Sequence, residues 1–269
     1  MKKYFCATFL LLTSFTFFSQ TTTPSVIREK FFTQSIGFSH NYNRDNLMSP
    51  LTYSGYGFEL HTGAERISEK WYKKFDLWGN FSQFQSRVEN GYNYTANGIH
   101  WGVSQIWARR VMPSETRFRW YVGGGVFHDG SINVRGANTN NSISYNLPTG
   151  VEAATFLAKN VRIFKLDWVL STQFSLPFLA YNARPSYIGT TDTENFTQEY
   201  GIVTLNKLLM FDWRWQIDRP LSNGNRLRAI YRWNYVDDKH SGRLQEGSQV
   251  LSLEMLFNIP FRKKKSVEN

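Results

Sequence analysis

Apolar and polar residues alternate along most of the chain beyond residue 30, and a period of two residues is the period of a β-strand. The clearest case lies at about 164–178, where Trp168 and Leu170 share one face and Gln173 and Ser175 share the other. No window sustains the i, i+3, i+4, i+7 spacing of an amphipathic helix. The pattern therefore predicts an all-β protein.

Ten segments of this kind are expected. They lie at about 32–42, 52–63, 73–86, 94–108, 116–127, 145–158, 162–178, 202–217, 226–236 and 248–259. Globular strands average about 5 to 6 residues, whereas a tilted transmembrane strand needs about 9 to 11, and the segment at 162–178 is as long as a membrane strand. We therefore predict an antiparallel up-and-down transmembrane β barrel of about ten strands, with eight to twelve possible.

The connections between these segments alternate in length. The even-numbered connections are short and lie at about 64–72, 109–115, 159–161 and 218–225. The long connections are odd-numbered and lie at about 128–144, 179–201 and 237–247. Membrane barrels have short periplasmic turns and longer outer loops, so this sorting favours a barrel with both termini in the periplasm. A continuous strand within 181–188 would break this argument from the sorting.

Large aromatic residues lie near the ends of several predicted strands, on the apolar face. The candidate interface aromatics are Trp107, Trp120, Trp213, Trp215, Trp233 and Tyr235, with Trp71 and Tyr72 in similar places. They would form the aromatic girdle of a membrane barrel. The alternative is that aromatic residues simply favour strands. Alternation alone also leaves open a soluble β sandwich or a lipocalin-like cup, in which the apolar face is the core.

The polar faces of the same segments carry many charges. The candidate lumen charges are Arg117, Arg119, Lys165, Asp167, Asp212, Arg214, Arg226, Arg228, Arg232 and Glu254, and Glu59 and Glu152 also lie on the polar face. A lumen lined by arginine would select anions. A barrel of about ten strands, however, encloses little more than its own side chains. We therefore expect a lumen plugged by pairs of arginine and carboxylate, because each buried charge needs a partner.

The first residues read as a secretory signal peptide. Lys2 and Lys3 precede an apolar run without acidic residues, and the expected boundary follows residue 20. The chain has 269 residues and a net charge of +10, and no later segment approaches the roughly 20 apolar residues of a membrane helix. The only cysteine, Cys6, lies within the apolar run, so the mature protein would have no disulfide and no thiolate metal site.

The expected domain organisation is a signal peptide at 1–20, a periplasmic segment at 21–30, a single barrel at 31–261 and a basic tail at 262–269. The barrel segment ends on Leu256 to Phe261, an apolar and aromatic close that resembles the assembly signal of outer-membrane barrels. The barrel assembly machinery is therefore an expected partner. The basic tail departs from that signal.

Several stretches resemble a family of uncharacterised secreted proteins from Bacteroidetes, known as a domain of unknown function. They are Leu51 to Leu60 followed by Ala64-Glu65-Arg66, Phe174 to Phe178, Gly224 to Tyr231, and the terminal strand with its lysines. The resemblance covers nearly all of the chain from about residue 31. It implies an outer-membrane β barrel and no catalytic residues.

No enzyme signature is evident in the sequence. His100 and Ser104 share a strand face, but four residues along a strand span about 13 Å, too far for a hydrogen bond. His128 and Asp129 are adjacent and so point to opposite faces. No two histidines have the spacing of metal ligands. We expect no metal and no cofactor.

The favoured function is therefore a structural or interaction role at the outer membrane, through the outer loops or through contact with lipopolysaccharide phosphates at a basic rim. Alternatives are a small anion-preferring pore, an envelope-lipid hydrolase with serine and histidine brought together across strands, and the soluble sandwich or cup. Nucleic acid is an improbable partner because no clustered basic patch carries stacking aromatics. The sequence leaves the oligomeric state open.

Overall fold

The computed structural model describes residues 28–46, 51–87, 93–113, 118–135, 143–186, 197–240 and 242–260. It consists of β-strands joined by turns. The strands are β1 (Arg28–Asp45), β2 (Tyr53–Ser68), β3 (Trp71–Arg87), β4 (Asn93–Arg110), β5 (Phe118–Arg135), β6 (Ile143–Asn146), β7 (Thr149–Ile163), β8 (Leu166–Ser186), β9 (Thr197–Thr204), β10 (Leu208–Pro220), β11 (Arg226–Asp238) and β12 (Leu244–Asn258). None of the described residues forms a helix long and apolar enough to cross a membrane.

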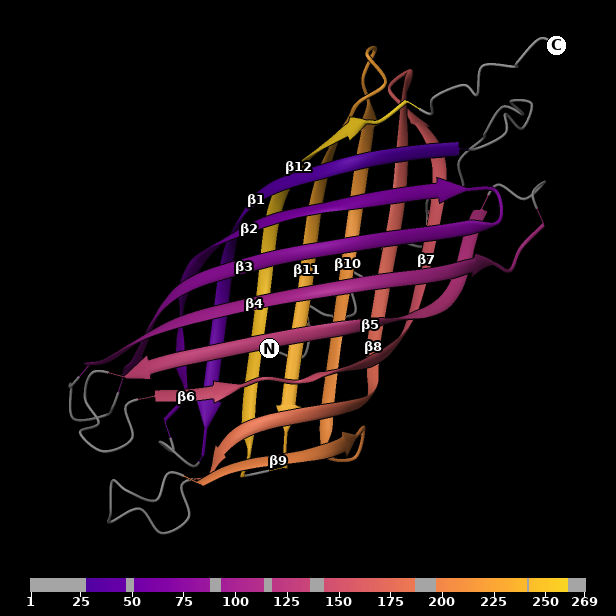
Figure 1. Cartoon of the computed structure of the whole chain (residues 1–269). Coiled ribbons are helices and arrows are strands. Elements are labelled where there is room, and N and C mark those ends of the chain that lie inside the picture. The colour runs from indigo at the N-terminus through magenta and orange to yellow at the C-terminus, as the bar shows by residue number, and fades with distance from the viewer. Residues whose placement is uncertain are drawn as a thin grey trace, which may run out of the picture.

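The strands close into a barrel in which every pairing is antiparallel. β1 to β5 pair in chain order, β5 pairs with β7, β7 with β8, and β8 with β10. β10 to β12 again pair in chain order, and β12 returns to pair with β1. The short strands β6 and β9 extend the wall beyond this ring, on β5 and β8 respectively. The ring therefore has ten strands, as predicted. Figure 1 shows β1 to β5 crossing in front of β10 to β12, with β6 and β9 at the same lower end.

The strands at the long-connection end reach further than the sequence indicates. β5 continues to Arg135, β8 to Ser186 and β11 to Asp238, so large parts of the expected loops at 128–144 and 179–201 are strands. The strand within 181–188 does not disturb the sorting of connections, because β9 folds back and pairs with β8 from Leu179↔Thr204 to Ser186↔Thr197. The two form a hairpin at the long-connection end.

The short connections lie close to their expected places, with one shift. The turn expected at 159–161 lies instead at Phe164 and Lys165, because β7 and β8 stay paired as far as Ile163↔Leu166. Both turn residues have positive φ, at 50° and 65°, which is the backbone conformation of a two-residue type I′ hairpin turn. The β2–β3, β7–β8 and β10–β11 turns lie at the same end of the barrel, where β4 ends and β5 begins, towards the upper right in Figure 1.

The two ends of the barrel wall meet at the short-turn end. β1 begins at Arg28, so the last residues of the expected periplasmic segment at 21–30 belong to the barrel wall. The backbone NH of Ile259 donates to the carbonyl of Lys30 at 2.8 Å, which holds both ends of the barrel together at the short-turn end. The expected signal peptide and the basic tail at 262–269 lie outside the described residues.

The wall is apolar outside and polar inside. Ile36, Phe38 and Leu251 expose 63%, 61% and 66% of their surface, whereas Arg228 and Glu254 expose 1% each. Successive side chains of a strand point to opposite faces, so this contrast is the alternation seen in the sequence. A soluble sandwich or a lipocalin-like cup would place the apolar face inside, so this arrangement supports the outer-membrane barrel better than either alternative.

Candidate functional site

The candidate site is the charged lumen, and the strand register builds it. On β10 and β11 the inward residues fall at every second position, and the register pairs Asp218 with Arg228 and Arg214 with Arg232. On the other side of β11, Arg228 lies opposite Glu254 of β12. Charges that alternate along single strands thus become neighbours across strands.

Arg228 is the centre of the network. Its Nε lies 2.6 Å from Oδ1 of Asp218, and its Nη1 lies 2.8 Å from Oε2 of Glu65 and 3.0 Å from Oε2 of Glu254. Glu65 comes from β2, which is not adjacent to β11 in the wall. The guanidinium therefore connects separate parts of the wall through the interior, and its five donors suit this role.

A second group lies beside it. The Nε2 of His61 is 2.7 Å from Oδ1 of Asp76, and its Nδ1 is 3.2 Å from Oε1 of Glu254. Lys74 Nζ lies 3.1 Å from Oδ2 of Asp76. All four side chains are nearly inaccessible to solvent. Two carboxylates hold one imidazole between them, so a histidine on β2 links β3 to β12.

A third group involves two arginines that share a carboxylate. Arg214 and Arg232 lie 3.0 Å and 2.7 Å from Oδ2 of Asp212. Arg214 also reaches Asp76 at 2.6 Å, and Arg232 reaches Glu59 at 3.1 Å. We call these three groups together the lumen plug. Its members are Glu59, His61, Glu65, Lys74, Asp76, Asp212, Arg214, Asp218, Arg228, Arg232 and Glu254.

An aromatic cluster fills the neighbouring part of the lumen. Tyr72 of β3 stacks on Phe156 of β7 with ring centroids 4.1 Å apart, and its hydroxyl donates to Gln173 of β8 at 3.2 Å. Tyr121 of β5 is also completely buried and packs against both rings. These contacts cross the barrel from one wall to another, so side chains fill the lumen here.

Another ion pair closes the long-connection end. Arg184 of β8 lies 2.7 Å from Asp45 of β1 and 3.9 Å from Asp238 of β11. Asn182 donates to the same carboxylate of Asp238 at 2.7 Å. Both Arg184 and Asp45 are fully buried. We call Asp45, Asn182, Arg184 and Asp238 the outer clasp.

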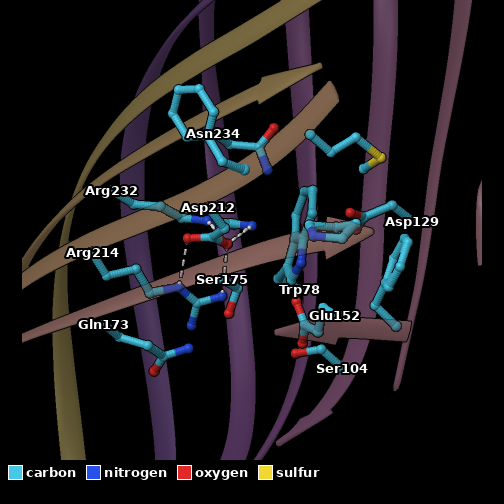
Figure 2. Close-up of a pocket in the computed structure, with 14 residues that line it drawn as sticks. Trp78, Ser104, Asp129, Glu152, Gln173, Ser175, Asp212, Arg214, Arg232 and Asn234 are labelled. Atoms are coloured by element: carbon cyan, nitrogen blue, oxygen red, sulfur yellow. Dashed lines mark hydrogen bonds and ion pairs between the residues drawn. The ribbon is translucent and has the colours of Figure 1, made fainter. Parts of the chain in front are cut away.

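A pocket lies between the lumen plug and the outer clasp. Its cavity volume is about 30 Å³, enough for a few water molecules, and its lining includes Trp78, Asp129, Glu152, Asp212 and Arg214. Figure 2 shows these side chains pointing into it, with the Asp212 and Arg214 pair on one wall and Glu152 on another. The lumen is therefore not uniformly packed.

The candidate lumen charges divide into two groups. The structure places Arg119, Asp212, Arg214, Arg226, Arg228, Arg232 and Glu254 inside the barrel. Lys165 and Asp167 are not in the lumen, because they lie at the exposed β7–β8 turn, where the strand ends before its inner face is enclosed. Arg117 lies outside the described residues.

The candidate interface aromatics all lie outside the lumen. Trp107 and Trp120 lie near the short-turn ends of β4 and β5, and Trp233 and Tyr235 lie towards the other end of β11. Trp213 of β10 lies directly opposite Trp233 in the register, and its ring centroid is 5.0 Å from that of Trp215. One placement differs from expectation, because Tyr72 is inside the barrel.

Sequence reasoning missed several members of the lumen plug. Glu65, Lys74, Asp76 and Asp218 have the same parity as other inward residues of their strands, so alternation could have found them. His61 is harder, because its neighbour Thr62 is exposed to a similar degree and the burial pattern of β2 is irregular there. Arg184 lay in a segment expected to be a loop.

The catalytic alternatives find little support in the geometry. Within the described residues, no serine hydroxyl forms a hydrogen bond with a histidine ring, and no group of three metal-binding side chains occurs. His128 faces outward and contacts Thr149 Oγ1 at 2.7 Å through Nδ1, whereas Asp129 lines the pocket. These adjacent residues therefore point in opposite directions.

No family model matches the chain, and no curated protein sequence matches it. Solved structures do match. The outer membrane protease OmpT from Escherichia coli has a TM-score of 0.50 and 6% identity over 90% of this chain and 99% of that chain. The transport unit of the autotransporter AIDA-I from Escherichia coli has a TM-score of 0.44 and 9% identity over 95% and 97% of the two chains. At such identity the likeness to OmpT shows a common outer-membrane barrel fold and nothing of activity.

Proposed function

We propose that this chain is a closed, non-conducting barrel of the outer membrane with a structural or interaction role. The observation that carries the proposal is the lumen plug. Arg228 and Arg214 reach carboxylates on β2 and β3 from β11 and β10, so buried ion pairs span the interior. A water-filled channel requires a lumen that side chains leave open.

The proposed orientation follows from the connections. Short turns are typical of the periplasmic end of a bacterial barrel, so β6, β9 and the outer clasp would face outward. Export would depend on the apolar segment at 1–20. The sequence resemblance to the Bacteroidetes family of unknown function is compatible with this placement, and membership of that family remains a prediction.

The charge of the lumen disfavours an anion pore. The arginines of the lumen plug are all paired with carboxylates, and among the described residues buried carboxylates outnumber buried cations. A pore selects anions when its cations face the permeating ion. The net basic charge of the chain is therefore a property of other surfaces.

Planar-bilayer recording tests the proposal. The refolded protein should insert without producing conductance steps, because the lumen plug blocks ion passage. A heat-dependent shift in gel mobility of the same sample would verify that the barrel is folded. Steady, reproducible conductance from folded wild-type protein would contradict the proposal and favour the pore.

A second candidate function is binding of lipid phosphates at the basic rim, which we define as Arg44, Lys207, Lys239 and Arg243. Backbone hydrogen bonds bring these segments together, since the NH of Lys239 donates to Lys207 at 2.7 Å and the NH of Asn46 donates to Arg243 at 3.0 Å. Hydrogen bonding to Asp237 raises the pKa of Arg243 and keeps it cationic.

Aromatic side chains lie just below this rim on the outer surface. The ring centroids of Phe211 and Trp233 are 4.9 Å apart, and those of Phe211 and Tyr235 are 5.5 Å apart. An aromatic band beneath basic residues is the arrangement that contacts lipid headgroups at a membrane surface. This geometry favours lipopolysaccharide phosphate over an unrelated soluble anion.

Replacement of Lys207 and Lys239 together by Gln tests the rim. The affinity of the purified protein for lipopolysaccharide should fall more than tenfold, because each of the two cations near a charged lipid surface contributes about 1 kcal/mol. Lys73→Gln with Lys165→Gln removes the same charge near the short-turn end and should leave the bound lipid unchanged. Equal loss in both double variants would contradict a rim site.

A further inference from the structure

The pocket above the lumen plug belongs to a larger polar space. Three adjoining pockets all have Trp78 and Asn234 in their linings, and they extend from Asp212 towards Glu246 and His100. We call this space the lumen chamber and define it by Trp78, His100, Asp129, Glu152, Asn234 and Glu246. None of these residues belongs to the lumen plug or the outer clasp.

The lumen chamber contains carboxylates without cationic partners. Glu152 is 6% exposed, and its Oε1 has no hydrogen-bond partner among the described residues. Asp129 lines the same pocket and forms no ion pair within the described part of the chain. The nearest cations, Arg214 and Arg232, are engaged by Asp76, Asp212 and Glu59. The lumen plug therefore leaves this acidic charge uncompensated.

At the far end of the lumen chamber, Glu246 also forms no ion pair within the described residues. Glu246 accepts hydrogen bonds from the amides of Asn43 and Asn133 at 2.7 Å and 2.9 Å, which are neutral donors. The Nε2 of His100 has no hydrogen-bond partner within the described residues. Buried carboxylates are stable only when a proton or a cation compensates them. The lumen chamber thus offers acceptors to a positively charged guest.

The local sequence builds this acceptor site. Glu152 lies opposite Gly125 of β5, and a Cβ at Gly125 would lie 3.1 Å from the free Oε1 and would also collide with the carbonyl of Gln105. A Cβ at Gly102 would collide with Asp129 and Trp78. A register shift of β7 against β8 falls between Val151 and Glu152. Glycine and a bulge are the usual means of bringing a side chain close to a ligand space.

The walls favour an organic cation over a metal ion. The described residues include no group of three side chains that could hold a metal ion. The pocket is lined instead by Trp78, Phe127 and Met210 beside the carboxylates. Arg232 already lies 4.2 Å from the ring centroid of Trp78, so this indole contacts a cation. An ammonium group on a short alkyl chain matches both kinds of wall.

We propose that the lumen chamber binds a small organic ammonium ion, with Glu152 and Asp129 as the acceptors of its charge. The site goes beyond the proposed role of the barrel, because a closed barrel can hold a bound guest without conducting. The outer clasp lies between the lumen chamber and the long-connection end, so a guest reaches the site when that ion pair opens or while the barrel folds.

Equilibrium dialysis with radiolabelled propylamine tests the site. The protein is dialysed in detergent in two forms, folded beforehand or refolded in the presence of the amine, so that slow access does not hide binding. We expect saturable uptake of one amine per chain in the refolded sample. Affinity should fall at least tenfold in Glu152→Gln and in Asp129→Asn, and potassium should compete poorly.

Asp167→Asn is the matched control, because it removes an exposed carboxylate at the short-turn end and should leave affinity unchanged. Glu152→Gln keeps the shape of the side chain and removes an unpaired charge, so it should fold with unchanged or higher thermal stability. Absence of saturable uptake after refolding would overturn the proposal and indicate that a proton compensates Glu152. Equal affinity of wild type and Glu152→Gln would overturn it as well.

Discussion

Single residues decide whether the interior of this barrel is stable, and Arg228 shows why. Three carboxylates lie within 3.0 Å of its guanidinium, and all are inaccessible to solvent. A buried ion pair adds little net stability over apolar packing, but loss of one partner leaves the others uncompensated. The loss of stability on replacing Arg228 therefore depends on the carboxylates that would be left without a cation.

Replacement of Arg228 by Met should lower the free energy of unfolding by about 3–5 kcal/mol, because Asp218, Glu65 and Glu254 lose their common cation. Urea unfolding in lipid vesicles measures the change. Adding Glu65→Gln to this variant should restore part of the lost stability, since it removes one of the carboxylates left without a cation. Wild-type stability of Arg228→Met would show that the network is not coupled as described.

At the scale of elements, alternation in the sequence predicts which face of a strand a residue occupies, but not where the strand ends. The alternation places Arg228 and Glu254 on the polar face, and both side chains are buried inside the barrel. Lys165 and Asp167 have the parity of an inward face yet lie at an exposed turn. Arg184 was missed because its segment is rich in turn-forming and small residues but pairs with β9. Where such a strand ends depends on its pairing with a partner strand, and the local sequence does not show that pairing.

The β7–β8 turn offers a test at this scale. Phe164 and Lys165 both adopt positive φ, which is unfavourable for residues with a Cβ, and Phe164 is 93% exposed. Changing Phe164→Asn with Lys165→Gly should raise the free energy of unfolding by about 1 kcal/mol, because these residues suit a type I′ turn. Urea midpoints of both proteins measure the effect.

The β10–β11 turn offers a test in the opposite direction, in which a substitution should lower stability. Gly224 has a φ of 82°, so Gly224→Ala should lower the urea midpoint. If the double change at the β7–β8 turn also lowers it, the exposed ring of Phe164 contributes more through contact with the membrane surface than its backbone costs.

At the scale of the whole molecule, the fold class and the strand number follow from the pattern, whereas the partners across the lumen do not. Arg228 and Glu65 are 163 residues apart in sequence. Their contact depends on closure of the ring and on its tilt, and no local pattern encodes either. The lumen chamber escaped sequence reasoning for the same reason, since Trp78, Asp129 and Glu152 come from β3, β5 and β7.

Closure of the ring predicts a heat-dependent mobility. An unboiled sample should migrate differently from a boiled one in a detergent gel, because the closed barrel resists unfolding by detergent at room temperature. The native protein should also sediment with the outer membrane. A soluble protein with one mobility would contradict both the closed ring and its apolar exterior.

The lumen plug also imposes an order on biosynthesis. Its carboxylates Glu59 and Glu65 are made early, on β2, whereas the arginines that neutralise them are on β11. A nascent chain that ends before residue 226 therefore carries acidic groups that cannot yet be compensated by these arginines. The final hairpin supplies both the strand that seals the wall and the counter-ions for its first hairpin. These carboxylates are therefore neutralised by the β11 arginines only when the chain is complete. A truncated product keeps them without those counter-ions.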